Sequence, residues 1–88
     1  KMSNFKDAVS AIQEGGDKGS LIRERERLNR TVSRMKGELQ TYENNLGFLT
    51  LSSKKGNSVI TDLNNRVDKL RADIAMMEEK ISFINKSL

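Results

Sequence analysis

The 88-residue chain contains no histidine, cysteine, proline or tryptophan, and only 5% of its residues are aromatic. Histidine and cysteine are the usual protein ligands of zinc, haem and iron–sulfur clusters, and histidine is the commonest general base. Neighbouring carboxylates such as Glu78-Glu79 are expected to point to different faces of a helix, without a pocket around them. We therefore expect no enzyme, no catalytic residue, no metal site and no cofactor.

Hydrophobic residues make up 35% of the chain, whereas an average globular domain is nearly half apolar. This leaves little material for a deep core with a small-molecule pocket, so one elongated helical unit is expected. The longest apolar runs have two or three residues, as in Phe48-Leu49 and Ala75-Met76-Met77. Runs this short exclude a membrane-spanning helix or a signal peptide of the usual kind. The expected location is the cytoplasm, without membrane contact.

The charge is modest. Sixteen basic residues stand against 12 acidic ones, which gives a net charge of +4 spread along the chain. Such an excess does not by itself identify a nucleic-acid binder. Lys1 precedes Met2, which indicates either a chain cut from a longer protein or one added residue.

The first segment, residues 1–16, predicts a short amphipathic helix with Ser3 as its cap and Gly15-Gly16 as its end. Its apolar residues recur at helical spacing at Phe5, Ala8, Val9 and Ile12. Residues 17–20 are expected to form a flexible joint, in which Ser20 caps the helix that follows.

The remainder, residues 21–88, has two runs with the alternating steps of four and three that are typical of a coiled-coil seam. Apart from Arg25, the seam of the first run consists of Leu21, Leu28, Val32, Met35, Leu39, Tyr42, Leu46 and Leu49. The seam of the second run consists of Ile60, Leu63, Val67, Leu70, Ile74, Met77, Ile81, Ile84 and Leu88. A turn is expected at about 47–58, with Gly47 ending one helix and Asn57 or Ser58 capping the next.

A connection this short makes the two helices fold back antiparallel. If Leu46 pairs with Leu63, the successive seam residues of the two helices also pair, and the last pair is Leu21 with Leu88. In this register Lys36 lies nearest Arg71 and Glu38 nearest Asp73. Exposed side chains can relieve these like-charge contacts by swinging toward Glu43 or Lys80, so the flanking charges predict no partner specificity. The fold predicted is all-α: an antiparallel two-helix coiled-coil hairpin with a short N-terminal helix.

A second apolar strip leaves one packing question open. Met76 and Phe83, seven residues apart, are expected on the outer face of the second long helix. Phe5, Val9 and Ile12 would cover them within one chain, or from a neighbouring chain in a four-helix homodimer. These five residues form the predicted interaction surface.

Four arginines share the outward face of the first long helix, at Arg23, Arg27, Arg30 and Arg34. Arginine forks suit phosphate oxygens, so this ridge predicts contact with an RNA or DNA backbone as an alternative function. A solvated coiled-coil face is the simpler interpretation. The loop sequence Lys54-Lys55-Gly56-Asn57 lacks the spacing of a phosphate-binding motif and is expected to be a solvated turn.

The stretch from Arg23 to the C-terminus resembles the C-terminal helical hairpin of bacterial proteins containing the domain of unknown function numbered 349. The resemblance is carried by the Arg/Glu-rich start, by Tyr42-Glu43-Asn44-Asn45-Leu46-Gly47-Phe48, by Lys54-Lys55-Gly56-Asn57 and by the Asn/Arg/Lys-Leu second helix. It implies the tail of a large cytoplasmic helical protein and supplies no activity, cofactor or functional residue. The expected function is a non-enzymatic helical module for protein interaction or structure, with protein partners and no small-molecule substrate.

Overall fold

Three helices make up almost all of the computed structural model, which describes residues 2–52 and 58–88. They are α1 (Met2–Glu14), α2 (Lys18–Ser52) and α3 (Ser58–Ser87). No strand occurs within these two described stretches. The prediction of an all-helical fold is confirmed.

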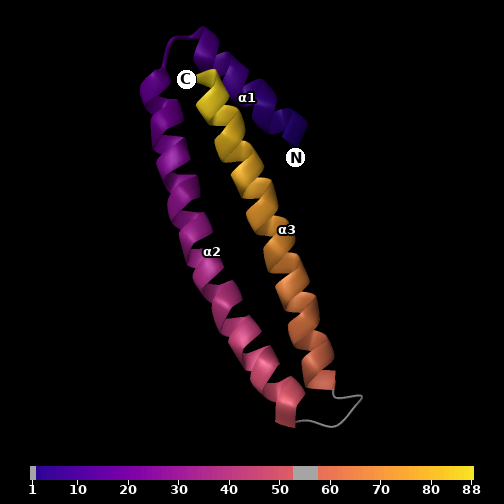
Figure 1. Ribbon diagram of the computed structural model, residues 1–88. Coiled ribbons are helices and arrows are strands. Elements are labelled where there is room, and N and C mark those ends of the chain that lie inside the picture. Colours follow the sequence, from indigo (N-terminus) through magenta and orange to yellow (C-terminus); the bar gives the residue numbers. More distant parts are fainter. Residues whose placement is uncertain (1, 53–57) are drawn as a thin grey trace.

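Helices α2 and α3 lie side by side and run in opposite directions, and the molecule measures 58 × 20 × 14 Å (Figure 1). The start of α2 and the end of α3 meet at one end, which we call the open end. Helix α1 turns back there and lies against the two long helices (Figure 1). None of the helices, over the residues described, is long and apolar enough to cross a bilayer.

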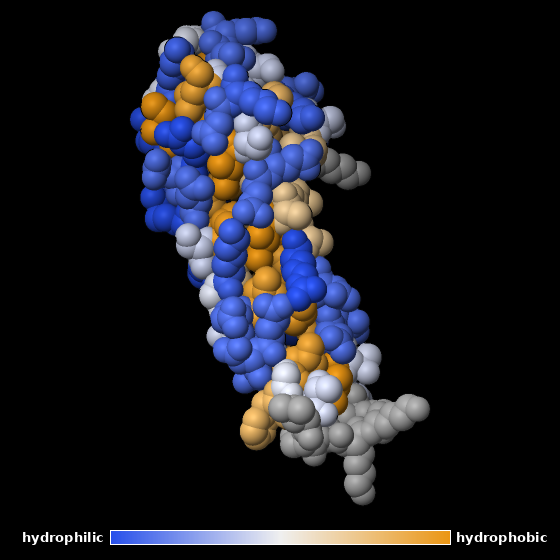
Figure 2. Space-filling view, in the orientation of Figure 1, coloured by the Kyte–Doolittle hydropathy of each residue, from blue (hydrophilic) through white to orange (hydrophobic). Residues whose placement is uncertain are grey.

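Apolar side chains fill the space between α2 and α3. Apart from Val9 of α1, every buried hydrophobic residue among those described occupies a predicted seam position: Leu21, Leu28, Val32, Met35, Val67, Ile74 and Ile84. Figure 2 shows these helices as rows of hydrophilic side chains with hydrophobic ones between them. Burial of this strip removes apolar surface from water, the main favourable term in folding.

The core is tightest at the open end. Leu21 and Ile84 are only 1% and 0% exposed, and they share a cluster with Leu28 and Val9. A second cluster of Val32, Met35 and Ile74 follows along the hairpin. Beyond it the seam residues are mostly half-buried, as at Tyr42, Leu46, Ile60 and Leu63. Stability is therefore expected to be concentrated where α1 joins the hairpin.

Helix α2 continues past Gly47 to Ser52, so the prediction that Gly47 ends the helix is wrong. The Thr50 hydroxyl donates a 2.7 Å hydrogen bond to the Leu46 carbonyl, as within a helix. Half-buried Leu46 and Leu49 keep this turn packed on the seam, which offsets the roughly 1 kcal/mol that a glycine costs in a helix. Residues 53–57 of the predicted turn, which include Lys54, Lys55, Gly56 and Asn57, lie outside the described residues, and α3 begins at Ser58.

A defined corner joins α1 to α2, where we expected a flexible joint over residues 17–20. Gly16 has a φ of 77°, and its N–H donates to the Gln13 carbonyl at 3.1 Å. The N–H of Asp17 donates to the Ile12 carbonyl at 3.2 Å. These two bonds form a Schellman motif, which satisfies the last carbonyls of α1 and needs a left-handed residue at Gly16.

The same Asp17 caps the next helix. Its carboxylate accepts hydrogen bonds from the Ser20 N–H at 3.1 Å and the Ser20 hydroxyl at 2.6 Å. Asp17 is therefore the cap of α2, and Ser20 lies in its first turn. Ser3 is likewise not a cap, because α1 already begins at Met2.

The corner follows from a break in the hydrophobic pattern. One heptad before Leu21 the chain has Glu14, so the seam of α2 does not extend into α1. At 3.6 residues per turn, a straight continuation would turn Phe5, Val9 and Ile12 away from the seam. Folding back at Gly16 lets this stripe pack against the hairpin.

Candidate interaction surfaces

Aromatic rings and lysines interleave where α1 meets α3. The rings of Phe5 and Phe83 meet edge to face, with centroids 6.4 Å apart and planes at 65°. Lys80 Nζ lies 5.1 Å from the centre of the Phe5 ring. Lys6 Nζ lies 5.5 Å from the centre of the Phe83 ring. Each ring thus contacts the other ring and one ammonium group, both favourable arrangements for the negative face of a ring.

Closer to the corner, α1 seals the open end of the hairpin. Val9 is 3% exposed and packs in one cluster with Leu21 and Ile84. Gln13 Nε2 donates a 3.0 Å hydrogen bond to the backbone carbonyl of Ser87, in the last turn of α3. That carbonyl has no acceptor role within the helix, so the glutamine satisfies a helix-terminal group.

The structure thus brings four of the five predicted surface residues together within one chain, namely Phe5, Val9, Ile12 and Phe83. Met76 is 46% exposed and is absent from this cluster. The packing observed is the folded-back arrangement.

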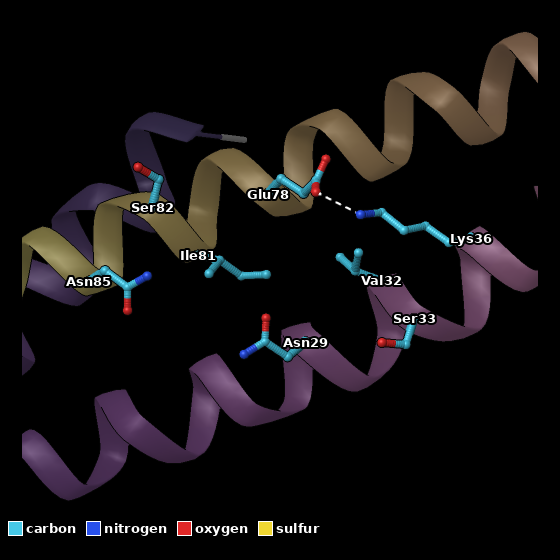
Figure 3. Close-up of a pocket in the computed structure, with 8 residues that line it drawn as sticks. All are labelled: Asn29, Val32, Ser33, Lys36, Glu78, Ile81, Ser82 and Asn85. Atoms are coloured by element: carbon cyan, nitrogen blue, oxygen red, sulfur yellow. Dashed lines mark ion pairs between the residues drawn. The ribbon is translucent and has the colours of Figure 1, made fainter.

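A shallow polar groove of about 440 Å³ follows one flank of the hairpin. Figure 3 shows Lys36 reaching from α2 to Glu78 of α3, with Nζ and Oε2 3.1 Å apart. Val32 and Ile81 contribute apolar side chains to the groove. The remaining lining residues are polar: Asn29, Ser33, Ser82 and Asn85.

Some polar groups of the groove are already paired with other side chains. Asn85 is already occupied, because its Oδ1 accepts a 2.9 Å hydrogen bond from Arg25 Nη1. The hydroxyls of Ser33 and Ser82 have no histidine to act as base, since the chain has none. Nowhere in the described part of the chain do three or more acidic side chains gather as a metal site would require.

The same flank continues toward the turn end as a groove of about 560 Å³, where Glu43 forms an ion pair with Arg71. Glu43 is seven residues after Lys36, and Arg71 is seven before Glu78, as expected for helices of opposite direction. Lys36 therefore pairs with Glu78 and does not remain beside Arg71, while Arg71 turns to Glu43, one of the two residues expected to relieve the like-charge contact. Each charge instead meets its opposite, because residues on the same flank of the two seams are neighbours.

The arginine ridge is largely paired with side chains of its own helix. Arg27 forms hydrogen bonds of 2.5 and 2.8 Å with Glu24, which hold the pKa of Glu24 below its usual value. Arg34 lies 2.7 Å from Glu38.

Two ridge arginines remain outside these ion pairs. Arg23 Nη2 donates to the Ser20 hydroxyl at 3.1 Å. The Arg30 side chain forms no hydrogen bond or ion pair with any residue in the described stretches, and it is exposed. All four predicted residues share a solvent-facing surface, but the positive charge available to a phosphate is smaller than their number suggests.

Comparison with protein-family models, with curated proteins and with solved structures found no match to this chain. The resemblance to the hairpin of proteins with the domain of unknown function 349 stays a prediction. Function is therefore argued from the geometry above.

Several contacts at the open end were not expected from the sequence. Lys6, Lys80, Gln13 and Ser87 all take part in the docking of α1. Adjacent aromatic and lysine residues, as in Phe5-Lys6, were the available signal, but they do not indicate which ring each lysine meets. The cap at Asp17 had a clearer signal in the sequence. Asp17 comes directly after the two glycines that end α1, and aspartate is a preferred capping residue at the start of a helix.

Proposed function

We propose that this chain is a non-enzymatic structural module, an antiparallel coiled-coil hairpin that α1 braces at its open end. It acts as a rigid spacer or docking element in an assembly of proteins. The observation that carries the proposal is the use of the apolar residues: seven of the eight buried hydrophobic side chains in the described part of the chain belong to two clusters between its helices. An arrangement of this kind holds two ends of a 58 Å body apart.

The surface supports the same role. Ion pairs link α2 with α3 at Lys36–Glu78 and at Arg71–Glu43, and each is partly exposed. Such pairs add little stability individually, but like charges in these places would disfavour this register. The two flank grooves are shallow and mostly polar at the end near α1, which suits reversible contact with a protein surface.

The rigidity can be measured directly. Spin labels would be attached through Glu26→Cys in α2 and Asn65→Cys in α3, two exposed positions near opposite ends of the hairpin. The chain has no other cysteine, so labelling is specific. We expect one narrow distance distribution by pulsed electron paramagnetic resonance.

Leu39→Asp serves as the comparison variant, because it places an unpaired charge on the seam. It should broaden the distribution and lower the helical content. A broad distribution in the parent chain would contradict a spacer role.

A further inference from the structure

Helix α1 binds the hairpin as a separate ligand would. Its contacts come from one stripe, Phe5, Val9 and Ile12, together with Lys6 and Gln13 beside it. Anchors at positions i, i+4 and i+7 are the usual pattern of an amphipathic helix that lies in an apolar groove. The groove belongs entirely to the other two helices, at Leu21, Phe83 and Ile84.

One corner links this ligand to its groove. Gly16 is the only residue with a positive φ within the described stretches. A Cβ atom at Gly16 would meet nothing within 4 Å, and at Gly15 it would approach only helix carbonyls at 3.5 Å. No packed side chain therefore fills the space beside Gly16, and the corner requires a residue that tolerates a positive φ there.

If the corner opens, both α1 and the hairpin lose the packing that stabilises them. Helix α1 has 13 residues, and helices of this length are marginal in water on their own. Removal of α1 would also uncover Leu21 and Ile84, the two most deeply buried side chains. The sequence that fits the vacated groove is that of α1 itself.

We propose that α1 is exchangeable between copies: it docks in the same groove of a second chain, and two chains form a closed homodimer by exchanging α1. The contacts in the dimer are those already present in one chain, so exchange needs no new interface. The balance between the two forms then depends on the corner and on protein concentration. A second copy of this chain is the partner.

The corner provides the test. Gly16→Ala penalises the left-handed conformation by about tenfold in the equilibrium constant. A dimer with two opened corners escapes this penalty twice, so its association constant should rise about a hundredfold. Sedimentation of the full chain would show Gly16→Ala dimerising at a much lower concentration than the parent. Gly37→Ala is the matched control: it lies in an open part of α2 and should not change the oligomeric state.

A second variant tests the exchange proposal without relying on the Gly16→Ala substitution. Deletion of Gly15 and Gly16 leaves too short a connection for α1 to turn back, so a folded chain should be dimeric. If both variants remain monomeric and helical at millimolar concentration, the exchange proposal is overturned.

Cross-linking identifies the exchanged contact. The double variant Lys6→Cys/Lys80→Cys, made in the Gly16→Ala background, places thiols on the two sides of the Phe5–Phe83 contact. A short bis-maleimide should join two chains covalently in an exchanged dimer. Only intramolecular products from a dimeric sample would refute exchange.

The exchange proposal rests on the hairpin proposed above, and the experiments distinguish failure of the hairpin from failure of the exchange. A chain that is not a hairpin gives a broad label distance and low helicity. A chain that is a hairpin without exchange gives a narrow distance and monomeric corner variants.

Discussion

The Asp17 carboxylate accepts a 2.6 Å hydrogen bond from the Ser20 hydroxyl and a 3.1 Å bond from the Ser20 N–H. This pair starts α2, while the backbone N–H of Asp17 closes α1 on Ile12. A single residue therefore fixes the ends of two helices. The direction in which α1 leaves the hairpin depends on it.

The cap should make stability depend on pH in acid. The hydrogen bonds from Ser20 hold the pKa of Asp17 below its usual value of 3.8. The folded pKa is lower than the unfolded one, so the cap contributes fully above the unfolded value and is lost as pH falls through the folded value. Asp17→Asn keeps an acceptor without titrating. We expect the difference in melting temperature between the parent and Asp17→Asn to change only below about pH 4.

Asp17→Ala removes the acceptor at every pH. It should lower the melting temperature at neutral pH, because two bonds to Ser20 are lost. Asp7→Ala is the control, since Asp7 is exposed and makes no bond with the residues described. Equal melting of the two variants at pH 7 would show that the cap adds nothing.

The Phe5–Phe83 contact should carry much of the docking of α1. Phe5→Ala removes the ring that meets both Phe83 and Lys80. Full burial of a phenylalanine makes this truncation cost about 3–5 kcal/mol; for half-buried Phe5 we expect about 2 kcal/mol in urea unfolding. Ala8→Ser, on the exposed side of the same helix, should change stability by less than about 0.5 kcal/mol. An effect of Phe5→Ala as small as this would mean that α1 does not depend on the ring.

Burial along the seam predicts a gradient of mutational cost. Ile84 is 0% exposed at the open end, so Ile84→Ala should destabilise the chain by about 3–4 kcal/mol. Ile60, near the turn end, is half-buried, and Ile60→Ala should cost about 1–2 kcal/mol. Chemical denaturation of the two variants measures the loss in free energy of unfolding for each. Equal losses would contradict a core concentrated at the open end.

The seam could be predicted from the sequence because hydrophobic spacing determines which helix face is buried. Leu21, Leu28, Val32 and Ile84 occupy buried positions for this reason. The corner at Asp17 and the continuation of α2 through Gly47 were missed for a common reason. Glycine permits both a left-handed turn and a helix, and the choice depends on packing farther along the chain. Half-buried Leu49 favours the helix at Gly47, whereas at Gly16 the change of hydrophobic face favours a turn.

The partner of Lys36 was missed for a different reason. The hydrophobic pattern predicts which residues face each other along the seam. It does not predict which charged groups form ion pairs, because long flanking side chains can extend to more than one partner. Lys36 and Glu78 form their pair between two partly exposed side chains. The sequence predicted the residues of the surface between α1 and α3, and the structure showed which of them contact one another.

The arginine ridge should bind nucleic acid only weakly. Arg27 and Arg34 are paired with Glu24 and Glu38, so a phosphate must compete with carboxylates for both. Arg30 lacks such a partner in the described stretches. We expect the affinity for duplex RNA to fall with salt with a slope that corresponds to about one or two phosphates, where four free arginines would give about four.

Two carboxylates provide the comparison. Glu24→Gln with Glu38→Gln releases Arg27 and Arg34 while the helix keeps neutral side chains of similar shape. Fluorescence anisotropy with a labelled RNA duplex should then show tighter binding and a slope that is steeper by about two. Arg30→Ala in the parent chain should remove most of the residual affinity. A parent slope near four, unchanged by the glutamine pair, would mean that the ion pairs open freely and that the ridge is a nucleic-acid surface as it stands.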